Sequence, residues 1–372
     1  MEFEVTQSMI VNLSDLVPKE HFLRKLTDNF PWNDWAKPFE KCFKGEKEYG
    51  PKGYPVPTLL KMTVLSYLYD LGDKQTENFV REANPARYFA GLSLLQPVPD
   101  ETTICRFRNR IAQKGKDKLL HTFFSEILKY AQKKGIEMGK VQVLDSTHTN
   151  SKVNLENENR RQKENRRDGE PPSAPLDPDA KWGCKGSKRK KDPETGEIKE
   201  EKQWFFGYKC HASLNQKTGL ITSLLVSPGN KPDNEAARWL LENDLSQGLK
   251  LTVVTADKAY DDGDLYAFCG GKEIFPAVNL RKSRTEQKNK KIVKHWEEHK
   301  KLPFYEAALK KRYKVEQKFG EAKCQHGLGR CRYFRERKYG FQAIFTFLSM
   351  NLKRILKLVF TPAKRRLSLC RA

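Results

Sequence analysis

The spacing of apolar residues divides the chain into a helical first part and a second part in which strands alternate with helices. Between residues 1 and 135, apolar residues recur at helical intervals, most clearly in "PTLLKMTVLSYLYDL" from Pro57 and "DKLLHTFFSEILKYAQKKG" from Asp117. Asp73 and Asp100 are candidate N-caps of two further helices, and Gly135 suits a helix end. Residues 1–135 are therefore predicted to form an all-helical domain.

Short apolar runs bounded by turn residues predict five strands between residues 136 and 360. The runs are "KVQVLDSTHTNSKV", "QWFFGYKCHASLN", "GLITSLLVSPGN", "KLTVVTAD" and "EIFPAV". Helices are predicted in "DNEAARWLLEN" and "DGDLYAFCGG", as one long charged helix over about 304–326, and as an apolar helix near the C-terminal end. A meander of three strands followed by alternating helix and strand favours an α/β domain, a mixed five-stranded sheet flanked by helices.

Residues 156–203 interrupt this order. They hold similar numbers of basic and acidic residues, with only Leu176, Trp182 and Ile198 as large apolar side chains. Such a segment buries too little surface to offset its ordering entropy, so it is predicted to be a flexible insertion. Whether it stays a solvated loop or becomes ordered on nucleic acid is left open. Residues 361–372 form a basic tail.

The charge of the chain narrows the class of partner. There are 70 Lys and Arg residues against 47 Asp and Glu, a formal net charge of +23. A field of this size attracts polyanions, which favours a nucleic-acid partner. The first residues lack the pattern of a signal peptide, and no apolar run approaches the roughly 18 residues of a membrane helix. Eight cysteines with no CxxC pair are typical of reduced thiols, so we expect a cytoplasmic protein with no membrane contact.

Three acidic residues are candidates for catalysis. Asp145 is predicted to end the first strand, Asp257 to end the fourth, and Glu316 to lie inside the long charged helix. The first and fourth strands become neighbours if the second and third form a hairpin to one side, and the late helix then brings the third carboxylate across. Taken singly, an Asp at a strand end is more often a turn cap, and a Glu on a charged helix is usually solvated.

Three converging carboxylates call for a cation. Like charges at close range repel and raise one another's pKa, and a divalent ion removes this conflict. Mg²⁺ prefers oxygen ligands and retains waters that substrate phosphates can replace. Two such ions about 3.5–4 Å apart activate the attacking oxygen and stabilise the leaving oxygen of a phosphodiester. Together with the basic charge, the three acids predict an enzyme that cuts or joins DNA strands.

Several basic residues are candidates for DNA contact. Arg106, Arg108 and Arg110 lie in the predicted helix "DETTICRFRNRI", although a plain helical bundle would also place arginines in water. Two tracts, "RKSRTEQKNKK" (281–291) and "GRCRYFRERK" (329–338), would hold the DNA backbone, the second through Arg330 and Arg332. In the second tract the neighbouring aromatic residues, Tyr333 and Phe334, could stack on exposed bases.

A further candidate for DNA contact lies in a predicted strand. In "GYKCH", Lys209 and His211 would share one sheet face, with Lys209 as a DNA contact. His148 and His211 are better explained as hydrogen-bonding scaffold than as metal ligands. Asp261 and Asp262 are candidate helix caps, and Asp233 is either a cap or a polar residue near the site.

The ordered blocks of the second part resemble those of a known family. "VLDSTHTNSKVN", "VVTADKAYDD" and "KRYKVEQKFGEAKCQ" are similar to successive blocks of the DDE transposases of bacterial insertion sequences, with the nearest resemblance to the insertion sequence 5 superfamily. The upstream helical region resembles the N-terminal domain of that group. The resemblance implies an RNase H-like catalytic fold, with Asp145, Asp257 and Glu316 as the DDE triad and Mg²⁺ as the metal, replaceable by Mn²⁺.

Related transposases carry a Tyr-x2-Arg-x3-Glu-x6-Lys signature around the glutamate. Arg312, Glu316 and Lys323 fit its spacing, but Leu309 stands at the tyrosine position. The tyrosine role either passes to Tyr313 or is absent. Steps of four and seven residues return to one face of a helix, so Arg312 and Lys323 are expected to meet the same DNA phosphate.

The resemblance implies a DNA transposase that cuts the ends of its element and joins them to target DNA. Its partner would be double-stranded DNA, both the terminal inverted repeats and the target, and it would act as a homodimer or higher oligomer in the bacterial cytoplasm, at the nucleoid when bound. Two rivals remain: a metal nuclease of the same fold that never joins strands, and a non-catalytic DNA-binding protein derived from a transposase.

Overall fold

The computed structural model of the chain divides into two compact units, Met1–Leu119 and Leu120–Ala372. The structure describes residues 12–43, 53–113, 115–167, 175–191, 198–281, 297–298 and 300–360. The unit boundary precedes the one expected at residue 135, since helix α7 (Asp117–Lys133) lies almost wholly in the second unit. Its Phe123 packs there against Phe345, with ring centroids 6.2 Å apart.

The first unit is helical, as expected. Its helices are α1 (Phe22–Asn29), α2 (Trp32–Glu40), α3 (Val56–Leu68), α4 (Asp73–Glu82), α5 (Asn84–Ala90) and α6 (Glu101–Ile111). Asp100 caps α6 by accepting from the backbone N–H of Thr103 at 2.7 Å, as its position predicts. The cap expected at Asp73 is wrong, because Gly72 is the N-cap of α4 and Asp73 is its first residue.

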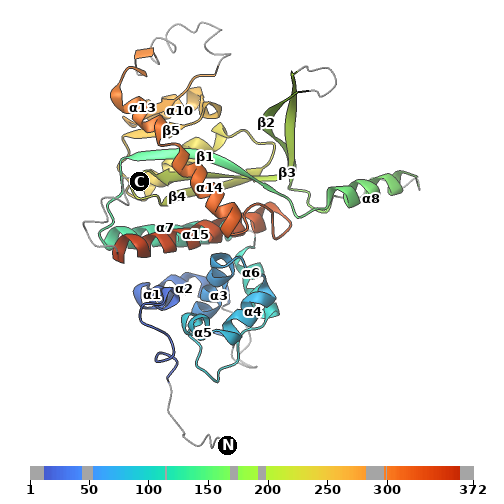
Figure 1. The fold of residues 1–372 in the computed structure, drawn as a ribbon, viewed down its shortest axis with the longest axis vertical. Helices are drawn as coiled ribbons and strands as arrows, with labels where there is room; N and C mark the ends of the chain where they lie inside the picture. Colours follow the sequence, from blue (N-terminus) through green and yellow to red (C-terminus); the bar gives the residue numbers. More distant parts are fainter. Residues whose placement is uncertain are drawn as a thin grey trace, which may run out of the picture. The chain divides into compact units, whose positions relative to one another are not determined.

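The second unit is built on a mixed sheet (Figure 1). Its strands are β1 (Val141–Asn150), β2 (Lys181–Lys191), β3 (Ile198–Asn215), β4 (Ile221–Pro228), β5 (Val253–Ala256) and β6 (Phe275–Val278). The order is β2-β3-β1-β5-β6, with β4 also paired to β3; β1, β5 and β6 are parallel, and β3 is antiparallel to β1. The expected α/β class, a mixed sheet flanked by helices, is confirmed, with six strands among the described residues instead of five.

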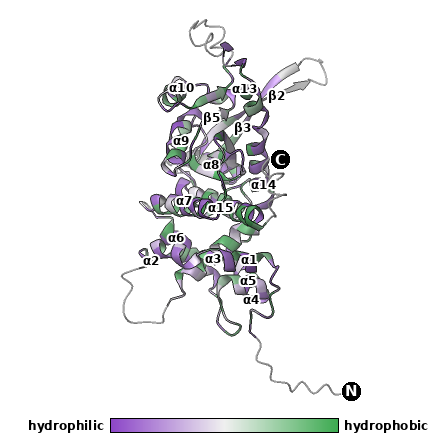
Figure 2. Cartoon of the chain, turned by 90° about the vertical axis from the view of Figure 1, so that its left-hand side faces the viewer, coloured by the Kyte–Doolittle hydropathy of each residue, from purple (hydrophilic) through white to green (hydrophobic). Residues whose placement is uncertain are grey.

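Five helices among the described residues of this unit pack on the sheet. They are α9 (Ala237–Ser246), α10 (Gly263–Gly270), α13 (Pro303–Lys310), α14 (Tyr313–Gln325) and α15 (Glu336–Phe360), with the 3₁₀ turns η1 (Asn234–Ala236) and η2 (Lys258–Tyr260). α8 (Leu155–Arg167) projects away from the sheet in Figure 1. α9 and α10 share a buried apolar cluster with Leu144, Val254 and Ala256 of the central strands. α15 lies beside α7 in Figure 1, and hydrophobic and hydrophilic segments alternate along both helices in Figure 2, as in amphipathic helices.

The expectation of a flexible insertion at 156–203 is wrong for two stretches, which form α8 and β2. β2 pairs with an N-terminal extension of β3, so the two strands make a ribbon. The pairing was missed in the sequence because few apolar side chains stabilise it. One such contact is between the Trp182 and Phe206 rings, which lie 5.5 Å apart across the two strands. Residues 168–174 and 192–197 of the insertion lie outside the described residues.

The single charged helix expected over 304–326 is two helices, α13 and α14. They separate because they pack on different strands: α13 contacts β5 and β6, and α14 contacts β1. Tyr305 anchors α13 by donating to the carbonyl oxygen of Val278 at 3.0 Å. Among the described helices, none is both long and apolar enough to cross a membrane.

Candidate active site

Asp145 and Asp257 lie side by side at the centre of the sheet. Val143 of β1 pairs with Thr255 of parallel β5, so two residues further along each chain the two aspartates occupy neighbouring positions on the same face. Adjacent strands are about 4.8 Å apart. Asp257 directly follows β5, as predicted, but Asp145 lies inside β1, which continues to Asn150 instead of ending at the aspartate.

Arg312 connects Asp145 to Glu316. Its Nη1 atom lies 3.3 Å from Asp145 Oδ2, and its Nη2 atom lies 2.7 Å from Glu316 Oε1. The Asp145 side chain is 14% exposed and that of Glu316 53% exposed. The contact of α14 with β1 thus brings the third acid to the first, and a guanidinium holds the position between the two carboxylates.

The electrostatics around Asp145 favour added positive charge. Burial, together with the nearby charges of Asp257 and Glu316, raises the pKa of its carboxyl to about 7, although the backbone N–H of Ser146 and the guanidinium of Arg312 act in the opposite direction. The Ser146 N–H donates to Asp145 Oδ1 at 2.8 Å. A carboxyl in these surroundings is ionised most readily beside a cation.

The donor set fits a divalent cation in its chemistry, because hard ions such as Mg²⁺ take carboxylate oxygens. Among the residues that the structure describes, however, no three His, Cys, Asp or Glu side chains lie close enough together to hold one ion. Asp257 also acts as a cap, since its Oδ1 accepts from the backbone N–H of Ala259 at 2.8 Å. Its position at a strand end suggests two roles, turn cap and metal ligand, and one carboxylate is compatible with both.

Comparison with known proteins assigns the chain to a family. A family model described as a transposase DDE domain matches residues 138–352, more than half of the chain, and a second, described as a transposase domain, matches residues 11–110. The chain belongs to the DDE transposases. Its function is that of a DNA transposase, an enzyme of metal-dependent DNA cleavage and strand transfer.

Two solved structures are also similar to this transposase over most of its length. One is a Mos1 transposase paired-end complex with left transposon end, 13% identical, covering 80% of this chain and 86% of that chain with a TM-score of 0.20. The other is a pre-cleavage Mos1 transpososome, 9% identical, covering 87% of this chain and 86% of that chain with a TM-score of 0.20.

Arg312 and Lys323 stand at opposite ends of α14 in the transposase. Arg312 is the N-cap and Lys323 lies in the last turn. Eleven residues of helix rise about 16 Å, a separation that argues against contact of both side chains with one phosphate. Burial and the charge of Lys185 lower the pKa of Lys323. Burial and the charges of Lys323 and Lys185 also lower the pKa of His148, to about 4, so this histidine is neutral.

The expected shared face of Lys209 and His211 is confirmed, and both approach Asp233. Lys209 Nζ donates to Asp233 Oδ1 at 2.9 Å and to the carbonyl oxygen of Lys231 at 2.8 Å. His211 Nε2 is hydrogen-bonded to Ser227 Oγ at 2.8 Å, which supports its interpretation as scaffold. Asp233 is the N-cap residue of η1, but its side chain makes no cap hydrogen bond. A DNA contact by Lys209 stays a prediction.

The other predicted DNA-contacting arginines differ in exposure. Arg106 is exposed, and Arg110 lies over the ring of Phe43, 5.0 Å from its centroid. The prediction for Arg108 is wrong, because its side chain is 7% exposed and forms two hydrogen bonds with Asp73 at 2.7 and 2.8 Å.

The second basic tract lies largely at the surface. Arg330 is exposed and Arg332 half-buried. Of the tract 281–291 only Arg281 is described, and the tail 361–372 lies outside the described residues.

The two acids after Asp257 have structural roles. Asp262 caps α10, as predicted, through the backbone N–H of Asp264 at 3.5 Å. Asp261 is buried and does not cap α10; it accepts from the Tyr266 hydroxyl at 3.0 Å and from the backbone N–H of Arg281 at 2.8 Å. These contacts hold the chain that follows Asp257.

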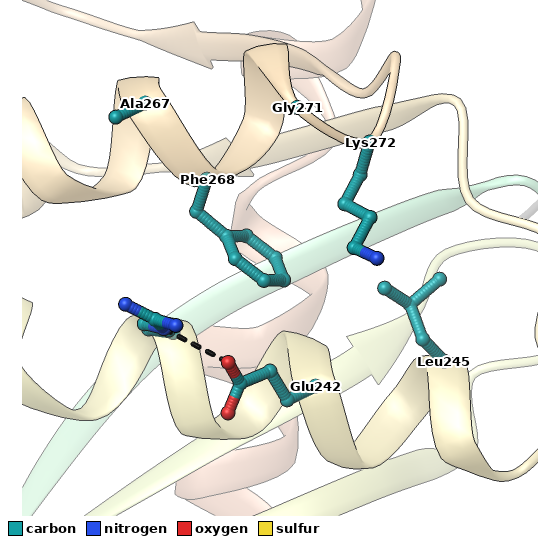
Figure 3. Close-up of a pocket in the computed structure, with 7 residues that line it drawn as sticks. Glu242, Leu245, Ala267, Phe268, Gly271 and Lys272 are labelled. Carbon is teal, nitrogen blue, oxygen red and sulfur yellow. Dashed lines mark hydrogen bonds and ion pairs between the residues drawn. The ribbon is translucent and has the colours of Figure 1, made fainter.

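A cavity of about 410 Å³ lies between α9 and α10 (Figure 3). Arg238 pairs with Glu242 at 2.8 Å on one wall, and Phe268 and Lys272 line the other. No residue predicted from the sequence to act in catalysis or DNA binding lines it.

Sequence reasoning missed a second group of residues, which lie at the far end of β1. Trp182 and Trp204 are 52% and 56% exposed, an unusual state for large apolar side chains. The signal in the sequence was the cluster of aromatic residues at 204–206 inside an otherwise charged segment.

Proposed function

We propose that Asp145, Asp257 and Glu316 are the catalytic, metal-binding carboxylates of this transposase and that Mg²⁺ is the ion, with Mn²⁺ as a substitute. The observation that carries the proposal is the register that makes Asp145 and Asp257 neighbours, together with the Arg312 bridge from Asp145 to Glu316. Ions held there would act as Lewis acids on the attacking and leaving oxygens of the scissile phosphodiester.

The residues of the chain prepare the site for this chemistry. In the structure, the Arg312 guanidinium lies between Asp145 and Glu316 and supplies positive charge to both carboxylates. Glu316 is half exposed and on the first turn of α14, so its side chain can turn towards the two aspartates when the guanidinium moves to a DNA phosphate. Arg312 then positions the scissile strand, and Lys323 holds the same strand further along.

The DNA partners are the terminal inverted repeats of the element and the target duplex. We assign the recognition of the repeats to the helical unit, where Arg106 and Arg110 lie at or near the surface. We assign contacts with the DNA phosphate backbone to three residues of the catalytic unit, Arg330, Arg332 and Lys209. Two ends must be joined in one event, so the active form is a homodimer or higher oligomer. The place of action is the cytoplasm, at the nucleoid when bound.

A strand-transfer assay tests the proposal. The full chain is incubated with Mg²⁺, a supercoiled target and a linear duplex that ends in the sequence flanking its coding region. We expect cleaved ends and joined products, both lost when Asp145→Asn, Asp257→Asn or Glu316→Gln replaces the wild type. Cleavage without joining would favour a nuclease, and full activity of any of the three variants would overturn the assignment of that residue.

Glu242→Gln provides a matched control. Glu242 is half exposed and pairs with an arginine four residues before it at 2.8 Å, as Glu316 pairs with Arg312 at 2.7 Å. Loss of this pair leaves the proposed site intact, so cleavage and joining should match the wild type. A loss equal to that of Glu316→Gln would mean that the assay reports general destabilisation.

A further inference from the structure

A cleft of about 630 Å³ opens at the end of β1, five residues beyond Asp145. Aromatic side chains from β2 and β3 form one wall, and the segment 150–156 forms another, including Glu156. Arg330 completes the lining. The volume falls within the range of small-molecule sites and is large enough for a nucleobase.

The aromatic wall is ordered but open to solvent. Trp182 and Phe206 are opposite each other in the β2–β3 register, and Trp204 lies two residues before Phe206 on the same face of the ribbon. The Trp182 and Phe206 rings are 5.5 Å apart at an interplanar angle of 54°. Trp182 and Trp204 nevertheless remain 52% and 56% exposed. Two neighbouring indoles with half of their surface in water offer flat faces to a ligand.

The charge beside this wall is positive and fixed in place. The backbone N–H of Asn150 donates to the Gly329 carbonyl at 3.3 Å, and that of Cys331 donates to the Asn150 carbonyl at 2.7 Å. These bonds hold Arg330 at the end of β1, where its Nη2 donates to the Lys152 carbonyl at 3.3 Å. Lys152 Nζ lies over the Phe334 ring, 5.6 Å from its centroid. Two cations thus stand next to the aromatic cleft, outweighing Glu156.

The cleft and the carboxylates both lie along β1. Arg312 contacts Asp145 at the start of α14, and Arg330, which follows that helix, is bridged to Asn150, so α14 and β1 run in the same direction. Five residues of strand span about 17 Å. With Lys323 in the last turn of α14, cations accompany β1 from the acids to the cleft. At a rise of 3.4 Å per nucleotide, about five nucleotides of one DNA strand cover this length.

From these observations we infer that the cleft binds an unpaired DNA base, which stacks on Trp182 and Trp204 while Arg330 holds its phosphate. The inference rests on the proposed function, because it places the strand that leaves Asp145 along β1. Stacking on aromatic rings accepts any base, so the cleft selects unpaired DNA and not a sequence. It would hold a strand of the element end or target that separates from its complement near the site of cleavage.

The test compares two DNA ligands at equal salt, one a blunt duplex and one with about five unpaired nucleotides at a 3′ end. We expect the wild type to bind the second ligand more tightly by fluorescence anisotropy. Stacking on one aromatic ring contributes roughly a tenfold effect per base, so Trp182→Ala with Trp204→Ala should remove that preference and leave blunt-duplex affinity unchanged. Trp204→Phe should retain most of it.

A second readout applies to the unmodified protein. A 2-aminopurine placed among the unpaired nucleotides should lose fluorescence on binding the wild type, and this quenching should disappear in the double variant. Phe304→Ala is the control, because Phe304 is a 44% exposed aromatic residue on α13, outside the cleft lining. It should leave preference and quenching unchanged.

Three outcomes would overturn the inference. One is equal wild-type affinity for both ligands without quenching; blunt-duplex binding and Asp145-dependent cleavage would then still support the proposed function. Another is an equal loss of both affinities in the tryptophan variants, which would make the wall part of a general DNA surface. The third is a change in oligomeric state, by sedimentation, on mutating the tryptophans, which would make the cleft an interface between copies of the chain.

Discussion

Arg312 is the residue at which the charges of the site meet. It lies within 3.3 Å of Asp145 and within 2.7 Å of Glu316. A guanidinium suits both roles that we assign to it, because its planar fork matches carboxylates in the free protein and phosphate in the complex. The signature spacing identified this residue in the sequence, whereas its position between the two acids required the packing of α14 on β1.

Replacing Arg312 by Gln should slow strand cleavage about 100-fold, since a donor aimed at the reacting phosphate typically contributes this much. Duplex affinity should change far less, because many other cations contact the backbone. Single-turnover cleavage at saturating protein measures the rate. Arg238→Gln, which removes the equivalent i,i+4 pair on α9, should cleave at the wild-type rate. Equal cleavage rates for the Arg312 and Arg238 variants would show that Arg312 does not act in the site.

At the scale of elements, β3 is held close to β1 by a residue without a side chain. A Cβ atom at Gly207 would lie 2.1 Å from the carbonyl oxygen of Thr149 and 2.8 Å from the backbone nitrogen of Ser151. Both neighbours are main-chain atoms of the segment that connects Asp145 to the aromatic cleft. The strands can adopt this spacing only with glycine at this position.

Gly207→Ala should therefore lower the free energy of unfolding by about 3 kcal/mol, the upper range for overpacking. Gly263→Ala is the control: its added Cβ meets nothing within 4 Å, so its effect should stay within about 1 kcal/mol of zero. Urea denaturation followed by circular dichroism gives both values. A Gly207 variant as stable as the wild type would show that β1 and β3 can separate without cost.

Asp244 links α9 to the β3–β4 hairpin from a fully buried position. It accepts from Ser213 Oγ at 2.5 Å and from Ser223 Oγ at 2.6 Å. Burial raises the pKa of its carboxyl to about 6, although both hydroxyls act against this shift. Since the folded state then holds the proton more tightly than the unfolded chain, Asp244 lowers stability as pH rises from about 4 to about 6.

Asp244→Asn should remove this part of the pH dependence. The wild type should lose about 1–2 kcal/mol relative to the variant between pH 4 and pH 6, and the difference should stay constant above that range. Urea unfolding of both proteins at several pH values measures it. A difference that grows in favour of the wild type as pH rises would mean that the hydroxyls lower the carboxyl pKa more than burial raises it.

The elements were predictable from the sequence wherever one periodicity dominated. The apolar stripe of α7 and the runs of β1, β4 and β5 identified these elements, and the parallel pairing of β1 with β5 followed from the hairpin between them. β2 was not predictable, although its partner β3 is the next strand in the chain, because its charged residues match a solvated loop. The break between α13 and α14 arises from tertiary packing, which a continuous helical pattern cannot reveal.

The sequence was sufficient to propose the residues of the candidate site but not to predict its geometry. The three acids and Arg312 follow from spacing and resemblance, whereas the internal position of Asp145 in β1 depends on pairing with β3 up to Asn150. Arg108 was misassigned because its neighbours at 106 and 110 are indistinguishable from it in the sequence. Only the fold shows that Asp73 binds it.

At the scale of the whole molecule, the net charge of +23 dominates the interaction with DNA. Binding that neutralises phosphates releases counterions, so affinity falls linearly with salt on a logarithmic scale. With six to ten contacts, affinity for duplex DNA should fall by about 10³–10⁵ between roughly 50 and 200 mM salt.

Arg330→Ala together with Lys323→Ala should reduce the logarithmic salt slope by about two, one for each lost phosphate contact, without changing preference between sequences. Anisotropy titrations over a range of salt concentrations measure the slope. Lys129→Ala with Lys217→Ala is a control of equal charge change, because both lysines pair with glutamates instead of DNA. The same reduction in the control would mean that the net charge of the protein, and not phosphate contacts of Arg330 and Lys323, sets the salt slope.

The central claim is that carboxylates 145, 257 and 316 share divalent ions, and Mn²⁺ binding tests it most directly. Electron paramagnetic resonance measures free Mn²⁺ during titration of the full chain bound to its end DNA. We expect Asp145→Asn, Asp257→Asn and Glu316→Gln each to weaken binding about tenfold or more, while Glu242→Gln binds like the wild type. Mn²⁺ affinity that is unchanged in any of the three variants would contradict the claim for that carboxylate.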